Sequence, residues 1–357
     1  MSRTPKGGRR KLDASVPPTY DVPTREPRFD SPRAARNIKA LTFVAWLVGT
    51  AGAATSVIAV GALSNVSAPS WIERPSAALL MIVFTIGLTH RGGGFMRIWL
   101  PMVTVLAVAS VVLETNMLLA ASAGVTAILA AVWAVLVTRP APTIVSATGE
   151  YIVTLVVALS GTVAVAAWNA PVDYQRFNLA VLTVSLGLAI TLVWNLGAGL
   201  HGLGRQNVLY LAGVAAVIVL ILVYSSYVRS NGSQALVRLI DDSVIWMRTH
   251  IDGVPRPVEV FVGFPALIVG VSRRAKRRDG WWIQVFAVIG TAVLTTSLVT
   301  PGAFPTYIGF STLYSAILGL VVGLVVRHYV VREPSARAAR AIEEVVRVEP
   351  PRFAPLK

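Results

Sequence analysis

The chain has 357 residues, of which 55% are hydrophobic and only 14% are charged, and it contains no cysteine. Soluble proteins average about 25% charged residues, so the composition excludes a water-soluble globular domain and indicates a membrane protein. The net charge of +15 does not indicate nucleic-acid binding, because the basic residues fall in short clusters between apolar runs. Without cysteine, the chain has no disulfide framework, thiolate metal site or thiol nucleophile.

Residues 1–37 are polar, rich in basic residues and proline, and lack any apolar period. Such a segment cannot bury enough apolar surface to offset the cost of ordering its backbone. The sequence therefore predicts a disordered, basic cytoplasmic tail that is attracted to anionic membrane lipids. The tail is too long and too polar for the start of a secretory signal peptide, so the first apolar run should be retained as a helix.

Residues 38–331 predict an all-α, polytopic membrane domain of about ten transmembrane helices. A transmembrane helix needs about 20 apolar residues. Seven runs satisfy this requirement: 38–63, 117–137, 151–170, 178–200, 207–228, 281–299 and 307–326. Three further runs are weaker because they are short or carry a proline: 76–88, 98–113 with Pro101, and 258–272 with Pro265.

The distribution of positive charge favours all ten spans. With a cytoplasmic N-terminus, ten spans place 26 of the 32 Lys and Arg residues on the cytoplasmic side, including the basic run at 273–278. Positive charge marks that side of a membrane protein, and removing one weak span would move this run to the other face. The sequence thus predicts a protein of the cytoplasmic (inner) membrane with both termini in the cytoplasm.

An inverted repeat is a further hypothesis about these helices. Ten helices divide into five plus five, and an odd-numbered unit repeated in tandem must come out inverted, an architecture in which transporter sites form at the repeat interface. The third and eighth helices would correspond, and these carry Pro101 and Pro265. Both prolines are therefore candidates for a substrate pathway, the alternative being tolerated kinks.

Small residues recur at spacings that suit close helix packing in lipid, as at Gly49 and Gly52 in the first run and Ser315, Gly319 and Gly323 in the last. These patterns are expected to serve packing within one chain rather than a dimer.

The charged residues and histidines of the sequence do not indicate an ion path, a metal site or a catalytic centre. No charged residue falls in the middle of a predicted span, and Glu259 is expected at the outer end of 258–272. Because mid-membrane charges usually mark ion or proton paths, this pattern weighs against a carboxylate relay. None of the four histidines has a ligand partner at helical spacing, and common hydrolase, zinc-protease and NTPase motifs are missing. No metal and no cofactor is predicted.

The longest loop, between the seventh and eighth spans, is expected on the extracytoplasmic side and contains an amphipathic helix near 233–251. Its apolar stripe includes Leu239 and Met247, and Asp241 and Asp242 lie on the opposing face. Paired carboxylates there are weak catalytic candidates for transfer from a lipid-linked donor. The favoured alternative is a solvated face on which the aspartates pair with Arg238 and Arg248.

Two other features complete the predictions. Asn195 is the amide placed deepest in a span and could contact substrate, although a role in helix packing is favoured. Residues 332–357 are predicted to form a cytoplasmic C-terminal tail with a short helix at 335–348, capped by Ser335.

A helix bundle with almost no soluble part can act through a path across the membrane or through a groove that binds a lipid. The leading hypothesis is a permease-like protein, or one that handles lipid or cell-envelope precursors. One alternative is an integral membrane transferase that acts at the extracytoplasmic face on a lipid-linked donor through Asp241 and Asp242. The other is a non-catalytic membrane subunit or scaffold. Expected partners are membrane lipids, and membrane proteins bound through the cytoplasmic tails.

Overall fold

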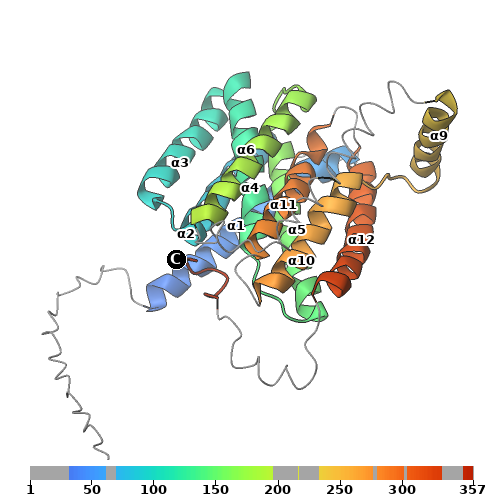
Figure 1. Ribbon diagram of the computed structural model, residues 1–357. Helices are drawn as coiled ribbons and strands as arrows, with labels where there is room; N and C mark the ends of the chain where they lie inside the picture. Colours follow the sequence, from blue (N-terminus) through green and yellow to red (C-terminus); the bar gives the residue numbers. More distant parts are fainter. Residues whose placement is uncertain are drawn as a thin grey trace, which may run out of the picture. The chain divides into compact units, whose positions relative to one another are not determined.

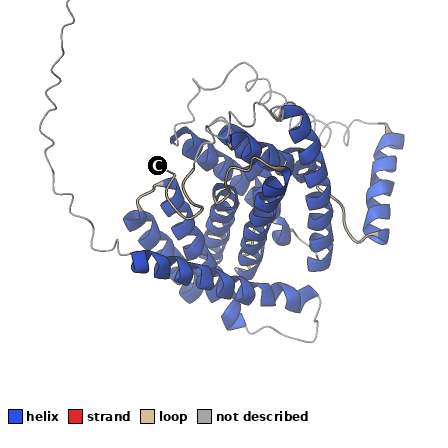
Figure 2. Cartoon of the chain, turned by 90° about the horizontal axis from the view of Figure 1, so that it is seen from below, coloured by secondary structure: helices blue, strands red, loops and turns tan. Residues whose placement is uncertain are grey.

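The computed structural model describes residues 32–61, 70–195, 216, 233–275, 280–300, 304–331 and 349–356. Every regular element in this part of the chain is a helix, as Figures 1 and 2 show. The elements are α1 (Pro32–Gly61), α2 (Ser70–Gly92), α3 (Met96–Leu113), α4 (Asn116–Leu136), α5 (Ile144–Ala167), α6 (Tyr174–Asn195), α9 (Gln234–His250), η3 (Glu259–Gly263), α10 (Phe264–Arg274), α11 (Gly280–Thr295), η4 (Ser297–Val299) and α12 (Pro305–Val330).

The protein is an all-α, polytopic membrane protein, which confirms the predicted fold class. Eight helices in the described residues are long and apolar enough to cross a membrane. Two runs that seemed weak in the sequence are among them, because α2 extends to 23 residues and α3 to 18. The predicted span at 207–228 lies outside the described residues. The run at 258–272 forms the helices η3 and α10, which are short and are not among these eight.

The chain divides into two compact units, Met1–Leu41 and Thr42–Lys357. In the first unit, the described residues form the beginning of α1. This helix starts at Pro32, earlier than the apolar run that begins at Ile38. Proline suits this position because the first N–H groups of a helix have no partner within the helix.

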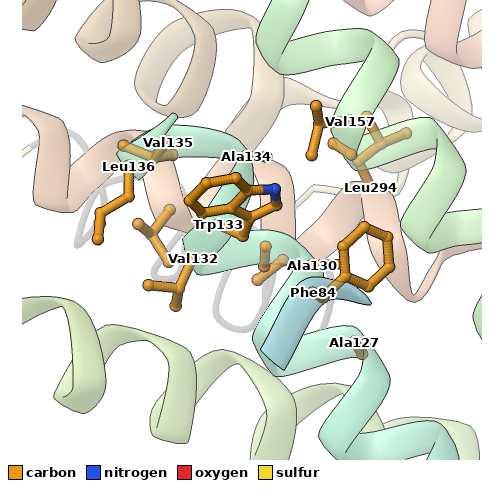
Figure 3. Packing of buried hydrophobic residues seen from close by; sticks show 14 of the residues in the cluster. Phe84, Ala127, Ala130, Val132, Trp133, Ala134, Val135, Leu136, Val157 and Leu294 are labelled. Atoms are coloured by element: carbon orange, nitrogen blue, oxygen red, sulfur yellow. The ribbon is translucent and has the colours of Figure 1, made fainter. Parts of the chain in front are cut away.

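Within the second unit, α4 and α11 form the centre of the core. α4 packs against α2, α5, α6 and α11. Figure 3 shows side chains from these helices meeting there, among them Phe84, Trp133, Val157 and Leu294. By contrast, α3 leaves much of its apolar surface exposed, including Ile98, Met102 and Val105. Exposed apolar faces of this kind fit a lipid environment.

Small residues allow helices to approach closely inside the unit. Gly49 and Gly52 of α1 face Leu80 and Ser76 of α2, and Gly319 and Gly323 of α12 face Phe264 and Ile268 of α10. The predicted packing role of these residues within one chain is thus confirmed. The closest approach joins Gly263 and Gly290, where a Cβ on Gly263 would lie 2.4 Å from the Gly290 Cα.

The helices of the second unit share two ends. α2, α4, α10 and α12 finish at one end, where α5 and α11 begin; we call it the Arg91 end. Contacts among the helix termini define it: Arg91 bonds to the Leu136 carbonyl, and Arg327 bonds to Ser272 and to the Pro142 carbonyl. The loop between α5 and α6 lies at the other end.

Candidate functional site

Residues 251–256 run alongside α12 as non-helical, mostly half-buried chain. The Val254 N–H donates to Ser311 Oγ at 3.0 Å, and the Arg256 N–H donates to Ser315 Oγ at 2.8 Å. Irregular backbone at membrane depth needs protein partners, because lipid offers none. The two serine hydroxyls of α12 therefore supply what this segment needs to lie within the bundle.

At the end of this segment, Arg256 and Glu259 form a buried ion pair. Arg256 Nη1 lies 2.7 Å from Glu259 Oε1. The Glu259 side chain is 0% exposed and that of Arg256 is 20% exposed. Burying two charges costs several kcal/mol per ion, and their mutual attraction offsets this only with good geometry and further hydrogen bonds. A pair kept at such a cost is a candidate for function.

The pair is only partly satisfied by the protein. Glu259 Oε2 and Arg256 Nη2 are both buried without a hydrogen-bond partner, as is the hydroxyl of Thr312 on α12. Leaving such a group unpaired costs about 1–3 kcal/mol each. One ion pair, with Ser315 beside its carboxylate, thus offers an acceptor oxygen and a donor nitrogen that an ion, a proton or a polar ligand could engage.

Glu259 lies much deeper in the bundle than the sequence suggested. It lies beside Ser315, which is ten residues after Pro305 and 15 before Val330, the two ends of α12. At about 1.5 Å per residue, these separations correspond to about 15 and 22 Å. Glu259 is the first residue of η3, so it lies at the end of its own span as expected. This end lies well along α12, because the non-helical residues 251–256 before it already run beside that helix.

A π-helical turn, η3, begins at Glu259 itself. The Phe264 N–H donates to the Glu259 carbonyl, five residues earlier. Pro265, next in the chain, is buried near the start of α10. Proline has no N–H to donate and its ring crowds the carbonyl of the preceding turn, so the wider π turn accommodates it. Such turns occur frequently at functional sites.

Tyr151 of α5 forms another wall of the site. Its ring packs edge-on against Phe264, with centroids 5.6 Å apart, and its hydroxyl donates to the Ala316 carbonyl of α12 at 2.8 Å. Tyr151 also lies within electrostatic range of Glu259. Tyr151 therefore joins α5 to α10 and α12 close to Glu259.

The three predicted pathway residues occupy different settings. Pro265 is buried six residues after Glu259, so it belongs to the surroundings of the ion pair. Pro101 is exposed on α3, and Asn195 is exposed as the last residue of α6. The comparison of two five-helix halves needs the 207–228 span, so the inverted repeat stays a prediction.

Asp241 and Asp242 are exposed on α9. Within the described residues neither forms an ion pair, and Arg248 instead lies over the ring of Tyr307, 4.9 Å from its centroid. Apolar residues of the same helix are exposed too, including Leu239 and Trp246. The helix itself is present where the sequence predicted one.

The sequence contained a signal for the buried pair that hydropathy alone missed. Arg256 and Glu259 are spaced by three, a distance that brings side chains together on a helix, and Pro255 and Pro257 flank the arginine. Ser311 and Ser315 share one face of α12 through the same kind of spacing. Each pattern is common by itself, and only their contact in space makes a site.

Among the described residues, no group of three or more His, Cys, Asp or Glu side chains is placed to hold a metal ion. Comparisons of the chain with protein-family models, with curated proteins and with solved structures find no match.

Proposed function

We propose that this protein is a permease-like membrane transporter whose substrate or coupling ion engages the Arg256–Glu259 pair. The observation that carries the proposal is the buried pair, with an unpaired Glu259 oxygen and an unpaired Arg256 nitrogen. An ionisable residue inside a membrane bundle is by default a functional candidate. A rigid scaffold has no need for two incompletely satisfied charges in its interior.

The backbone at the pair supports the same proposal. Transporters often place their sites where helices are interrupted, since backbone groups and side chains there can contact a substrate. Here a non-helical segment, the ion pair and a π-helical turn follow one another within residues 251–263. The transferase alternative depends on Asp241 and Asp242, which are exposed and make no ion pair in the described part of the chain.

The proposal includes the membrane in which the protein lies and its orientation there. It is an inner-membrane protein with the Arg91 end in the cytoplasm, because the described residues at that end include seven arginines: Arg91, Arg97, Arg139, Arg273, Arg274, Arg327 and Arg352. Single cysteines can test this orientation in a chain that has none. Pro171→Cys should react with a membrane-impermeant maleimide in intact cells, and Phe95→Cys should not. The reverse pattern would contradict the orientation.

Thiol accessibility also tests the proposed pathway. A transport path requires that water reach the ion pair from at least one side, whereas a solid scaffold excludes it. We would introduce Ser315→Cys and Thr312→Cys separately and treat purified protein in lipid nanodiscs with a small, charged methanethiosulfonate reagent. Both positions should be modified, and the rate should change when Glu259→Gln is added, because the carboxylate attracts or repels the charged reagent.

Ala130→Cys is the matched control, because Ala130 is fully buried in the apolar core on α4. It should resist the same reagent in folded protein. Protection of Ser315→Cys and Thr312→Cys at the level of Ala130→Cys would contradict a transport path and favour the scaffold. Modification of all three would indicate a loosened bundle, which gel filtration of each variant detects.

A further inference from the structure

A second group of buried charges lies at the Arg91 end, separate from the Arg256–Glu259 pair. Arg91 of α2 and Arg274 of α10 are both 0% exposed. Both donate to the carbonyl oxygen of Thr138, Arg274 at 3.2 Å and Arg91 at 3.5 Å. Two guanidinium groups that meet at one atom repel each other, and burial removes the water that would screen them. The two arginines therefore create a strong preference for an anion.

Arg274 is held in place by polar and aromatic groups, and the Nε and Nη2 edge of its guanidinium faces the Glu349 carboxylate. Nη1 donates to Thr138 Oγ1 and to Gln284 Oε1, each at 2.8 Å. The guanidinium also lies 3.6 Å from the centroid of the Trp281 ring. These contacts hold the guanidinium in one orientation. Its parallel N–H donors are then placed to bind the oxygens of a carboxylate or phosphate.

The end of the chain supplies an anion to this cluster. Glu349 Oε2 accepts from Arg274 Nη2 at 2.5 Å, and the Glu349 side chain is 3% exposed. Arg91 Nη1 donates instead to the backbone carbonyls of Pro351 and Ala354, at 2.6 and 2.9 Å. Figure 1 shows the C-terminus lying against the bundle. The C-terminal segment thus brings the Glu349 carboxylate to Arg274, while the groups that it offers to Arg91 are neutral carbonyls.

We propose that Arg91 and Arg274, positioned by Thr138 and Gln284, form a binding site for a phosphate group, which Glu349 occupies from within the same chain. A phosphate carries close to two charges at neutral pH and matches the two arginines better than one carboxylate does. A tethered competitor acts at an effective concentration of about millimolar, so a phosphate ligand in that range can displace it. The phosphate belongs to a free phosphate compound or to a lipid headgroup, and the experiment separates the two sources.

The test uses the full-length protein and two probes. Inorganic phosphate is titrated into protein in detergent, and its binding is followed by calorimetry. Hydrogen exchange of residues 349–356 is then measured with phosphate, and in nanodiscs of phosphatidylcholine with or without phosphatidic acid. In the wild type, the bound probe should expel the segment and speed exchange at Leu356, whose N–H donates to the Arg91 carbonyl.

Two variants separate this competition from a general effect of removing a charge. Glu349→Gln withdraws the carboxylate from Arg274 and should tighten phosphate binding about tenfold, because the charged competitor is gone. Glu114→Gln is the control, because it breaks a pair with Arg74 and leaves the C-terminal segment unchanged, so it should bind phosphate as the wild type does. Equal affinities of Glu349→Gln and Glu114→Gln would overturn the proposal.

The probes identify the source of the phosphate. Faster exchange of the segment with inorganic phosphate indicates a free compound, whereas an effect of phosphatidic acid alone indicates a lipid headgroup. If neither probe binds Glu349→Gln or changes exchange in the wild type, the site takes no phosphate and the proposal fails. This outcome leaves the transport proposal untouched, because that rests on a different ion pair.

Discussion

Arg352 and Glu150 lie 202 residues apart in the sequence, and the Arg352 guanidinium donates to both oxygens of the Glu150 carboxylate, at 2.6 and 2.9 Å. Glu150 also accepts from the Arg139 N–H at 2.9 Å. Near the C-terminus, residues 349–356 are therefore part of the folded unit. The predicted helix at 335–348 lies outside the described residues.

Removing the Glu150 charge should loosen the C-terminal segment. In Glu150→Gln, Arg352 bonds to a neutral amide instead of a carboxylate. The binding of residues 349–356 to the bundle should therefore weaken by about 1–3 kcal/mol. Hydrogen exchange of residues 349–356 should accelerate about tenfold or more, since about 1.4 kcal/mol is a factor of ten. Glu114→Gln is the control, because it breaks an exposed pair with Arg74 at the other end. Unchanged exchange in Glu150→Gln would show that Arg352 does not anchor the segment.

The ion pair in the middle of the bundle should show strong coupling. Arg256→Gln leaves the Glu259 carboxylate buried without its counter-ion, and breaking a buried pair in this way costs about 3–5 kcal/mol. Adding Glu259→Gln removes the stranded charge, so the double variant should be more stable than Arg256→Gln alone. Thermal unfolding in detergent of the two single variants and the double variant measures this coupling. Additive effects would mean that the two side chains do not interact.

The close crossing of η3 and α11 should not tolerate a methyl group. In Gly263→Ala the new Cβ would lie 2.4 Å from the backbone of Gly290, so two helices must move apart. The expected destabilisation is about 1–3 kcal/mol, as for other overpacked sites. Gly149→Ala provides the control, because nothing lies within 4 Å of its Cβ and alanine favours the helix. Similar melting temperatures for both variants would contradict this packing.

Substitution of the two aspartates of α9 distinguishes the transferase hypothesis from the transporter and scaffold hypotheses. Changing Asp241 and Asp242 together to Asn removes exposed charges and should leave expression and cellular phenotype unchanged. A general base at either position would instead make the double variant at least about 10²-fold less active. Leu239→Asp with Met247→Asp should impair the protein, because it breaks the apolar stripe of the helix. A folded but inactive Asp-to-Asn variant would favour the transferase.

Hydropathy was sufficient to predict the fold class because lipid forces a spanning backbone into helices. The apolar period also predicted the α9 helix, and the spacing of small residues predicted the close packing at Gly319 and Gly323. Hydropathy placed Glu259 at the end of its span, where η3 begins, but it did not show that this end lies beside Ser315, ten residues into α12. The non-helical residues before Glu259 are stabilised by serines of α12, far away in the sequence, and no local pattern reports such partners.

The sequence by itself determined that this chain is a helical membrane protein, and charge asymmetry led to a prediction of its orientation. Only the tertiary structure decided which polar residues meet. Arg91, Arg274 and Glu349 come from three distant segments, and each looks like an ordinary charged residue near a helix end. Their burial together, like that of Arg256 and Glu259, follows from the packing of helices whose contacts are set by shape. A one-dimensional pattern of hydrophobicity does not encode these contacts.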